Sequence, residues 1–142
     1  MKPNKSLGDL FGEDDEIESK KEKKSESTIP SILFKAQIDA KITHLLQKDK
    51  TFATHNAMGM FYDEVGDLID TFVETQMGLY PLSEICVEES CCIQNPLQYF
   101  TALYKTIDTI RKPIKESFLQ NQVDEIQALI SHTLYRLKNI IT

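Results

Sequence analysis

One stretch of the sequence, residues 55–78, constrains the fold more than any other: HNAMGMFYDEVGDLIDTFVETQMG. Its apolar residues recur three and four positions apart, the spacing that places side chains on one face of a helix. The stripe comprises Met58, Phe61, Val65, Leu68, Ile69 and Phe72. We therefore predict a long amphipathic helix from about residue 52 to about residue 77, with Gly78 as its C-terminal stop. Such a helix must bury its apolar face against other elements.

Three further segments show the same helical spacing, and none alternates apolar and polar residues as a half-buried strand does. A first helix is predicted from Pro30, a residue type tolerated in the first helical turn, to about residue 47. A third begins with Asn95 as N-cap and Pro96 at the first helical position, and Pro113 should kink or end it near Arg111. The predicted core positions of the first, third and fourth helices are Phe34, Ile38, Ile42 and Leu45; Phe100, Leu103, Ile107 and Ile110; and Val123, Ile126, Ile130, Leu134, Leu137 and Ile141.

The four predicted helices make the chain all-α, and the length of one connection indicates how they are joined. Residues 79–95, LYPLSEICVEESCCIQN, show no clear period and are long for a link between antiparallel neighbours. We therefore expect this stretch to cross over the bundle, with or without a short helix of its own. A long crossover between the second and third helices is the connectivity of a ferritin-like four-helix bundle, which we predict for residues 30–142.

Residues 1–29 are predicted to be a disordered, charged tail. The segment GEDDEIESKKEKKSESTIP is almost entirely Glu, Asp, Lys and Ser, which cannot bury enough apolar area to offset the entropy of ordering. The tail has one apolar cluster, SLGDLF, which contains Leu7, Leu10 and Phe11. This cluster is either a docking motif for a protein partner or a chance grouping.

Composition argues against several classes of protein. The chain of 142 residues has a formal net charge of −6, which does not suit a protein that coats nucleic acid through a basic face. No apolar run approaches the ~18 residues of a membrane span, and the first residues lack the apolar core of a signal peptide. The three cysteines, Cys86, Cys91 and Cys92, are crowded into one segment, unlike a disulfide framework. We therefore expect a soluble, cytoplasmic protein.

The second helix carries four acids on one stripe, roughly opposite its apolar face: Asp63, Asp67, Asp70 and Glu74. The stripe is either a solvated surface or part of a metal site, because two carboxylates one turn apart can hold a hard cation and imidazole would add affinity for iron or zinc. The Glu-x-x-His pairs that mark di-iron bundles are absent from the predicted helices. An iron site buried within a single bundle is therefore not expected.

The span from His44 to Gly78 resembles the Dps family, the ferritin-like mini-ferritins that protect DNA in starved bacteria. The residues that carry the resemblance are two histidines, a phenylalanine eight residues after the first, and an Asp-x-x-x-Glu pair: His44, His55, Phe52, Asp70 and Glu74. The segments LIDTFVETQMGLYPL and NQVDEIQALISHTLYRLKNI also look like the family's, so the likeness covers most of residues 32–142. The block THNAMGMFYDEVGDLIDTFVE looks most like small Dps-like proteins encoded by phages.

The resemblance implies a homo-oligomer, a hollow dodecamer that oxidises iron(II) with peroxide or oxygen and stores the mineral inside. Its ferroxidase site would lie between two subunits, with His44 and His55 as metal ligands from one and Asp70 and Glu74 from its partner. Members that bind DNA often use a lysine-rich tail. Here acids offset the tail lysines, so we expect weak DNA binding or none.

The sequence departs from the family's pattern near both histidines. Gly59 stands where the family usually has a further acid, and LLQKDK replaces the Trp and Gly of the first-histidine motif. The interval from Phe52 to His55 is also one residue shorter than the family's. The alternative hypothesis is therefore a phage-encoded structural or interaction protein, in the host cytoplasm or the virion, that keeps the bundle but has a degenerate metal site.

Overall fold

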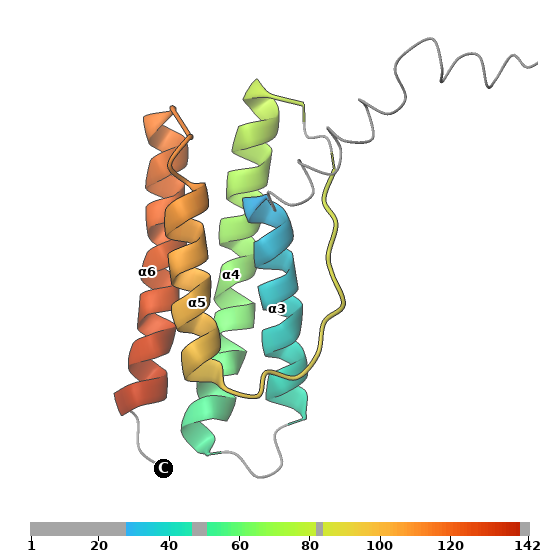
Figure 1. Cartoon of the computed structure of the whole chain (residues 1–142), viewed down its shortest axis with the longest axis vertical. Helices are drawn as coiled ribbons and strands as arrows, with labels where there is room; N and C mark the ends of the chain where they lie inside the picture. Colours follow the sequence, from blue (N-terminus) through green and yellow to red (C-terminus); the bar gives the residue numbers. More distant parts are fainter. Residues whose placement is uncertain (1–27, 47–50, 82–83, 140–142) are drawn as a thin grey trace, which may run out of the picture.

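The computed structural model describes residues 28–46, 51–81 and 84–139, which form four helices and no strand (Figure 1). The helices are α3 (Ile29–Leu45), α4 (Phe52–Leu79), α5 (Pro96–Ile110) and α6 (Ser117–Asn139). In Figure 1 α3 and α6 run downward and α4 and α5 run upward, side by side in one bundle. The predicted all-α class and the four predicted helices are confirmed. None of the helices in these ranges is both long enough and apolar enough to cross a membrane.

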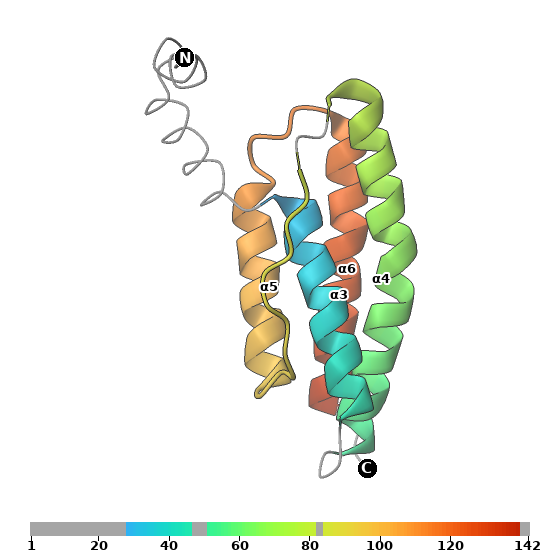
Figure 2. The ribbon, with the colours of Figure 1, turned by 90° about the vertical axis from the view of Figure 1, so that its right-hand side faces the viewer.

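The connection between α4 and α5 crosses the whole bundle. Its residues 84–94, called the strap below, run along α3 and α5 from the end of α4 to the start of α5 (Figure 2). Because the strap returns the chain to the lower end of the bundle, α5 runs parallel to α4. The described part of this connection contains no helix, so of the two predicted forms of the crossover the one without a helix is observed.

Side-chain caps start three of the helices. Thr28 caps α3 and Thr51 caps α4, each accepting a hydrogen bond from the main-chain N–H three residues later. Asn95 caps α5 by accepting from the N–H of Gln98 at 3.1 Å, with Pro96 at the first helical position as predicted. The predicted stop at Gly78 is wrong by one residue, because α4 continues to Leu79 and the N–H of residue 80 closes the last turn.

The core confirms the predicted apolar faces of α4, α5 and α6 but not that of α3. Phe61 and Phe100 pack edge to face at the centre, with ring centroids 4.8 Å apart. On α3 the predicted positions Ile38 and Leu45 are 41% and 66% exposed. The buried residues of that helix are Ile29, Pro30, Leu33, Ala36, Asp39, Ala40 and Thr43. The prediction failed because α3 has apolar residues on both faces, so that spacing alone fits two orientations. The predicted core residue Ile141 lies outside the described residues.

Candidate functional site

Two of the predicted site residues lie against each other at the lower end of the bundle. His44 is in the last turn of α3 and His55 is near the start of α4, so both lie where these two neighbouring helices meet the same end of the bundle. Their rings are stacked with centroids 3.9 Å apart and planes 19° from parallel. Each ring nitrogen Nδ1 bonds to the main-chain oxygen of the other histidine, at 2.9 Å from His44 and 3.2 Å from His55.

These reciprocal bonds fix the proton on each histidine. A carbonyl oxygen can only accept a hydrogen bond, so each Nδ1 donates and carries the proton. In the neutral ring the other nitrogen, Nε2, then has a free lone pair, which is the form that binds a metal ion. His55 is exposed and His44 is half-buried. The pair therefore offers two imidazole donors whose orientation is set by the protein main chain.

Gly59 makes room for the His44 ring. A Cβ atom placed on Gly59 would lie 2.9 Å from both Cε1 and Nδ1 of His44, closer than real side chains approach one another. The edge of Tyr62 supports the same ring, with centroids 5.4 Å apart. Any side chain at position 59, including the acid that the Dps pattern has there, would compete with the observed place of His44.

Substituting the helical glycines of α4 tests this close approach. Alanine in a helix interior is about 0.5–1 kcal/mol more stable than glycine. Gly78→Ala meets nothing within 4 Å and should stabilise the fold. Gly66→Ala meets only the end of the flexible Gln37 side chain, at 3.2 Å, and should be near neutral. Gly59→Ala should instead destabilise by about 1 kcal/mol, because overpacking against the His44 ring outweighs the gain.

Thermal and urea unfolding of the three glycine variants measure these differences. If Gly59→Ala stabilised the protein as much as Gly78→Ala, the His44 ring would not occupy the space beside Gly59.

The predicted acidic ligands lie far from the histidine pair in the same chain. Asp70 and Glu74 are exposed on α4, and Asp70 follows His55 by fifteen residues, about 22 Å along a helix. No three His, Cys, Asp or Glu residues in the described ranges are grouped so that they could hold a metal ion. The structure thus brings together two of the four predicted ligands. That the two histidines meet Asp70 and Glu74 of a neighbouring subunit stays a prediction.

Sequence analysis missed a buried carboxylate, Asp39, which holds the strap in place. Its side chain is 1% exposed and accepts hydrogen bonds from Lys35 Nζ at 2.7 Å and the Tyr99 hydroxyl at 2.6 Å. The main-chain N–H of Cys91, in the strap, donates to the same carboxylate at 3.1 Å. One turn along α3, Thr43 Oγ1 accepts from the N–H of Ile93 at 2.7 Å. Asp39 therefore ties together α3, the strap and α5.

The environment of Asp39 favours its ionised form. Burial alone would raise the pKa of this carboxyl, but the bonds from Lys35, Tyr99 and Cys91 hold the pKa below its usual range. Burial and the neighbouring carboxylate raise the pKa of the Tyr99 hydroxyl far above its usual range, so the tyrosine stays protonated and donates. Asp39 comes three residues after Ala36 and four before Thr43, so it lies on the same face of α3 as these buried residues. This spacing indicates a buried charge once that face is known to point to the core.

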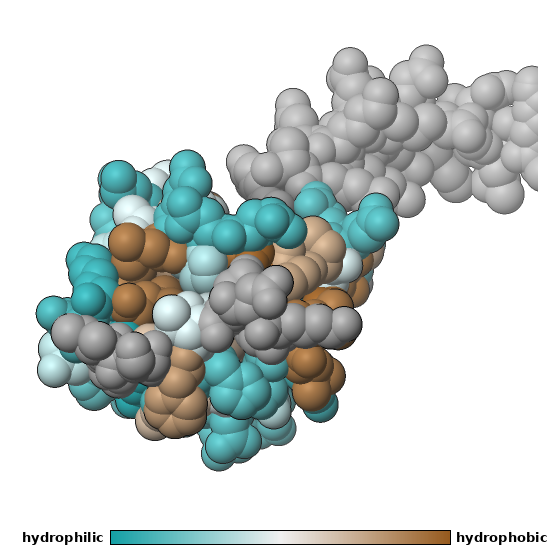
Figure 3. Space-filling view, turned by 90° about the horizontal axis from the view of Figure 1, so that it is seen from below, coloured by the Kyte–Doolittle hydropathy of each residue, from teal (hydrophilic) through white to brown (hydrophobic). Residues whose placement is uncertain are grey.

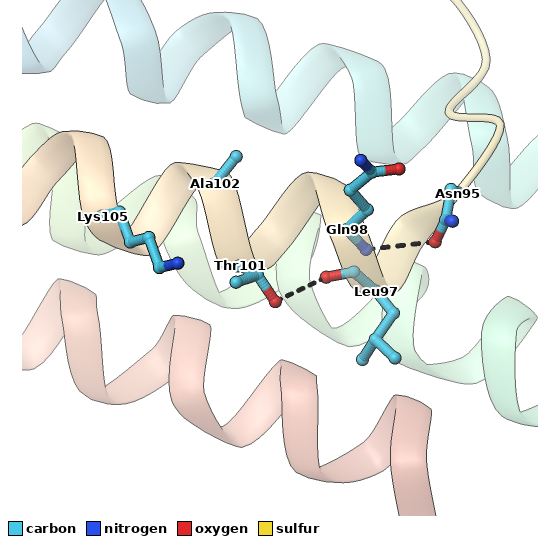
Figure 4. Close-up of a pocket in the computed structure, with 6 residues that line it drawn as sticks. All are labelled: Asn95, Leu97, Gln98, Thr101, Ala102 and Lys105. Atoms are coloured by element: carbon cyan, nitrogen blue, oxygen red, sulfur yellow. Dashed lines mark hydrogen bonds between the residues drawn. The ribbon is translucent and has the colours of Figure 1, made fainter.

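The described residues also include a hollow along α5, the third histidine and the three cysteines. A hollow of about 410 Å³ lies along α5 and is lined by the residues drawn in Figure 4: Asn95, Leu97, Gln98, Thr101, Ala102 and Lys105. These residues include no histidine, cysteine or acid that could carry out proton transfer or nucleophilic attack. His132 lies exposed on α6, and the three cysteines lie in the strap. The predicted docking residues Leu7, Leu10 and Phe11 lie outside the described residues.

Comparison with protein families gives a match. It is described as a family of unknown function (DUF5856) and covers residues 44–137, from His44 through α4, the strap and α5 into the last turns of α6. No curated protein and no solved structure matches the chain. Since the match spans well over half of the sequence and includes both histidines, the chain belongs to the DUF5856 family.

Proposed function

We propose that this chain is a Dps-like, ferritin-like subunit of a homo-oligomer that binds iron(II) at sites between subunits and oxidises it there. The observation that carries the proposal is the histidine pair, because both Nδ1 atoms are held by main-chain oxygens and neither Nε2 atom has a hydrogen-bond partner among the described residues. Neutral imidazole nitrogen is a common ligand of iron. The long crossover between α4 and α5 supports the ferritin-like connectivity of the proposal.

The acids of the proposed site come from a neighbouring subunit. Asp70 and Glu74 are exposed one turn apart on α4, so they can approach a second chain together. Within one chain they are too far along α4 from His55 to share an ion with it. Imidazoles from one subunit and carboxylates from the other give the mixed donor set that suits iron(II). Each bound ion would then give one electron to peroxide or dioxygen.

An apolar surface beside the histidines supports contact between subunits. Leu45, which follows His44, is 66% exposed, and Phe52, one turn before His55, is 62% exposed. Leu46 adds a third exposed apolar side chain. Figure 3 shows this end of the bundle, where hydrophobic patches lie among hydrophilic residues. Exposed apolar patches rimmed by polar groups commonly mark protein contacts.

The stack must open if both histidines bind the same ion. Metal ions bind imidazole in the plane of the ring, and the two rings are only 19° from parallel. Their Nε2 lone pairs therefore point along neighbouring planes and not at a common point. Binding one ion between them requires the rings to turn apart.

Aerobic oxidation of iron(II) by the purified protein, followed by ferric absorbance, tests the function. Asp70→Ala and Glu74→Ala should each slow the protein-dependent rate about tenfold or more, since each removes a metal ligand. Asp63→Ala is the matched control, because it removes an exposed acid of the same helix that the proposed site does not use. Equal rates in all variants, or no bound metal in the wild type, would contradict the proposal. A monomer in light scattering would remove the shared site.

Gly59 favours a second candidate function, that of a structural or interaction protein. In such a protein the histidine pair would only hold α3 against α4. The ring of His44 fills the space that a further ligand at position 59 would need, and the reciprocal bonds join α3 to α4 without any metal. In that case His55→Ala would lower stability and leave iron oxidation at the background rate of the wild type. The same variant separates the two candidates, because the iron-oxidising protein would lose a measurable activity.

A further inference from the structure

The strap carries two adjacent cysteines, Cys91 and Cys92, at the point where it is fastened to the bundle. Neither takes part in a disulfide, and Cys91 is exposed whereas Cys92 is half-buried. The next residue, Ile93, is 5% exposed and belongs to the hydrophobic core. The two thiols therefore lie directly beside a buried anchor of the strap, where small reagents from solvent can reach them.

Two hydrogen bonds show that this part of the strap is extended. The N–H of Cys91 donates to Asp39 at 3.1 Å. The N–H of Ile93 donates to Thr43 Oγ1 at 2.7 Å. The two acceptors are four residues apart on α3, about 6 Å, which matches two extended residues of about 3.3 Å each. Adjacent side chains of an extended segment point to opposite sides, so the thiols of Cys91 and Cys92 point apart.

A disulfide between the two cysteines is incompatible with this arrangement. An S–S bond is about 2.05 Å long, so both sulfurs must lie on the same side of the peptide that joins the two residues. That peptide has to turn, and the N–H groups on either side of Cys92 then cannot both point to α3. The disulfide and the pair of hydrogen bonds to Asp39 and Thr43 therefore exclude each other.

We propose that Cys91 and Cys92 form a redox switch of the strap. In the reduced protein the strap is bonded to α3 through both N–H groups. A peroxide converts the two thiols to a disulfide, and the strap then gives up at least one of its bonds to Asp39 and Thr43. Reduction of the disulfide by a thiol restores both bonds. The switch is independent of the proposed iron chemistry.

The oxidation is a two-electron step in which hydrogen peroxide is the oxidant. The sulfur of the exposed Cys91 attacks one peroxide oxygen, the O–O bond breaks, and a sulfenic acid and one water form. The sulfur of Cys92 then attacks that of Cys91, the S–O bond breaks, and a second water leaves. The two thiols give up two electrons and two protons, which the peroxide takes up.

The spacing of the two cysteines makes the disulfide easy to reverse. Adjacent Cα atoms are about 3.8 Å apart, which is below the range of about 4.4–6.8 Å found in ordinary disulfides. Strained and exposed disulfides are reduced more readily than structural ones, and bonds of this kind serve in regulation. A disulfide between neighbours thus suits a reversible signal and adds no lasting cross-link to the fold.

The third cysteine of the strap is held too far away to compete. The N–H of Cys86 donates to Ser31, whereas that of Cys91 donates to Asp39. These acceptors are eight residues apart on α3, about 12 Å along the helix. Two cysteines whose Cα atoms are more than about 7 Å apart cannot be bridged without movement of the main chain. Cys91 and Cys92 are therefore the pair that oxidation joins.

The switch acts on the link between α3 and α5. The main helix contacts are α3 with α4, α4 with α6 and α5 with α6, and the strap runs along α3 and α5 (Figure 2). The carboxylate of Asp39 accepts from the Cys91 N–H of the strap and from the Tyr99 hydroxyl of α5. Turning the peptide after Cys91 therefore loosens the strap where it is bonded together with α5.

Treating the purified full chain with hydrogen peroxide, then alkylating it and mapping its peptides by mass spectrometry, tests the disulfide. The peptide that contains Cys91 and Cys92 should lose two hydrogen atoms and resist alkylation until it is reduced. Cys86→Ser should leave this result unchanged, and Cys92→Ser should abolish it. Thiols that stay open to alkylation, disulfides to Cys86, or disulfides between copies of the chain would each overturn the proposal.

Amide hydrogen exchange on the same samples tests whether the strap is released. After oxidation, exchange at the N–H of Cys91, of Ile93 or of both should become roughly tenfold faster or more, because a hydrogen bond to α3 is lost. Adding a reducing thiol should restore the slow exchange. Unchanged exchange at both groups in protein that carries the disulfide would overturn the switch.

Two buried threonines provide a matched pair of variants. Thr43 and Thr133 are both 0% exposed, and each donates to the main-chain oxygen four residues earlier in its own helix. Of the two, Thr43 also accepts from the strap. In glutathione redox buffers Thr43→Val should shift the equilibrium about fivefold toward the disulfide, since it removes one bond that opposes the turn. Thr133→Val should not shift it, and equal equilibria in both variants would overturn the coupling.

Discussion

Asp39→Ala is expected to lower the free energy of unfolding by roughly 2–4 kcal/mol. The change removes a buried acceptor and leaves three donors without their partner: the Lys35 ammonium, the Tyr99 hydroxyl and the Cys91 N–H. Loss of one member of a buried charge pair costs more than this in fully enclosed sites, but the Lys35 side chain is 30% exposed and water can solvate it. The strap should loosen first, because its Cys91 N–H loses the partner that joins it to α3.

Urea unfolding and amide hydrogen exchange together measure the effect of Asp39. Exchange should speed up at the N–H groups of Cys91 and Ile93 well before it does in α4 or α6. Asp67→Ala removes an exposed acid of α4 and should stay within about 0.5 kcal/mol of the wild type. If Asp39→Ala and Asp67→Ala had equal free energies of unfolding, or if Asp39→Ala left hydrogen exchange in the strap unchanged, Asp39 would not anchor the strap.

The contribution of Asp39 should depend on pH in one direction. The hydrogen bonds place its folded-state pKa below the ordinary value of 3.8, so the folded protein binds this proton more weakly than the unfolded chain does. The stabilisation is then fully present above the unfolded pKa and is lost as the pH falls through the lower folded pKa. The stability gap between wild type and Asp39→Asn should therefore narrow below about pH 4 and be constant above about pH 5.

The helices whose core faces were predicted correctly are those with one dominant apolar stripe. On α4 the large residues Phe61, Val65 and Phe72 share one face and acids occupy the other, so spacing alone determines the orientation. On α3 the larger residues Ile38 and Leu45 pointed to the wrong face, because the core there uses Ala36 and Ala40. Lys35, one partner of the buried Asp39, lies one turn away on α3, but the other two, Cys91 and Tyr99, lie 52 and 60 residues away, where no local pattern reports them.

Only the part of the candidate site that residues close in the sequence form, the pair of His44 and His55, could be predicted. His44 and His55 are only eleven residues apart and lie at the adjoining ends of two successive helices, so their proximity could be expected. Their sequence positions could not show that each ring would bond to the other's main chain. Gly59 was interpreted from the sequence as a missing ligand, and the structure adds that its lack of a side chain is what lets His44 lie there. Whether Asp70 and Glu74 join the pair depends on a second subunit, which one sequence does not describe.

Mixing two inactive variants should restore iron oxidation if the site is shared between subunits. One variant carries His44→Ala and His55→Ala, and the other carries Asp70→Ala and Glu74→Ala. Each alone lacks half of every site and should be inactive. A mixed pair of subunits joined by a two-fold axis has one site with both halves removed and one site fully intact.

Random mixing in equal amounts makes half of the pairs mixed, so about a quarter of the wild-type sites should recover. The measurement compares the initial rate of aerobic iron(II) oxidation before and after the variants are unfolded together and refolded, with each variant refolded alone as its control. A site within a single chain predicts no recovery at any mixing ratio, because every chain then lacks two of its own ligands. Recovery near a quarter would distinguish complementary halves from a general effect of refolding, since that effect would raise the single variants as well. Activity in the acid variant alone would instead show that the histidine pair suffices and that Asp70 and Glu74 belong to the solvated face of α4.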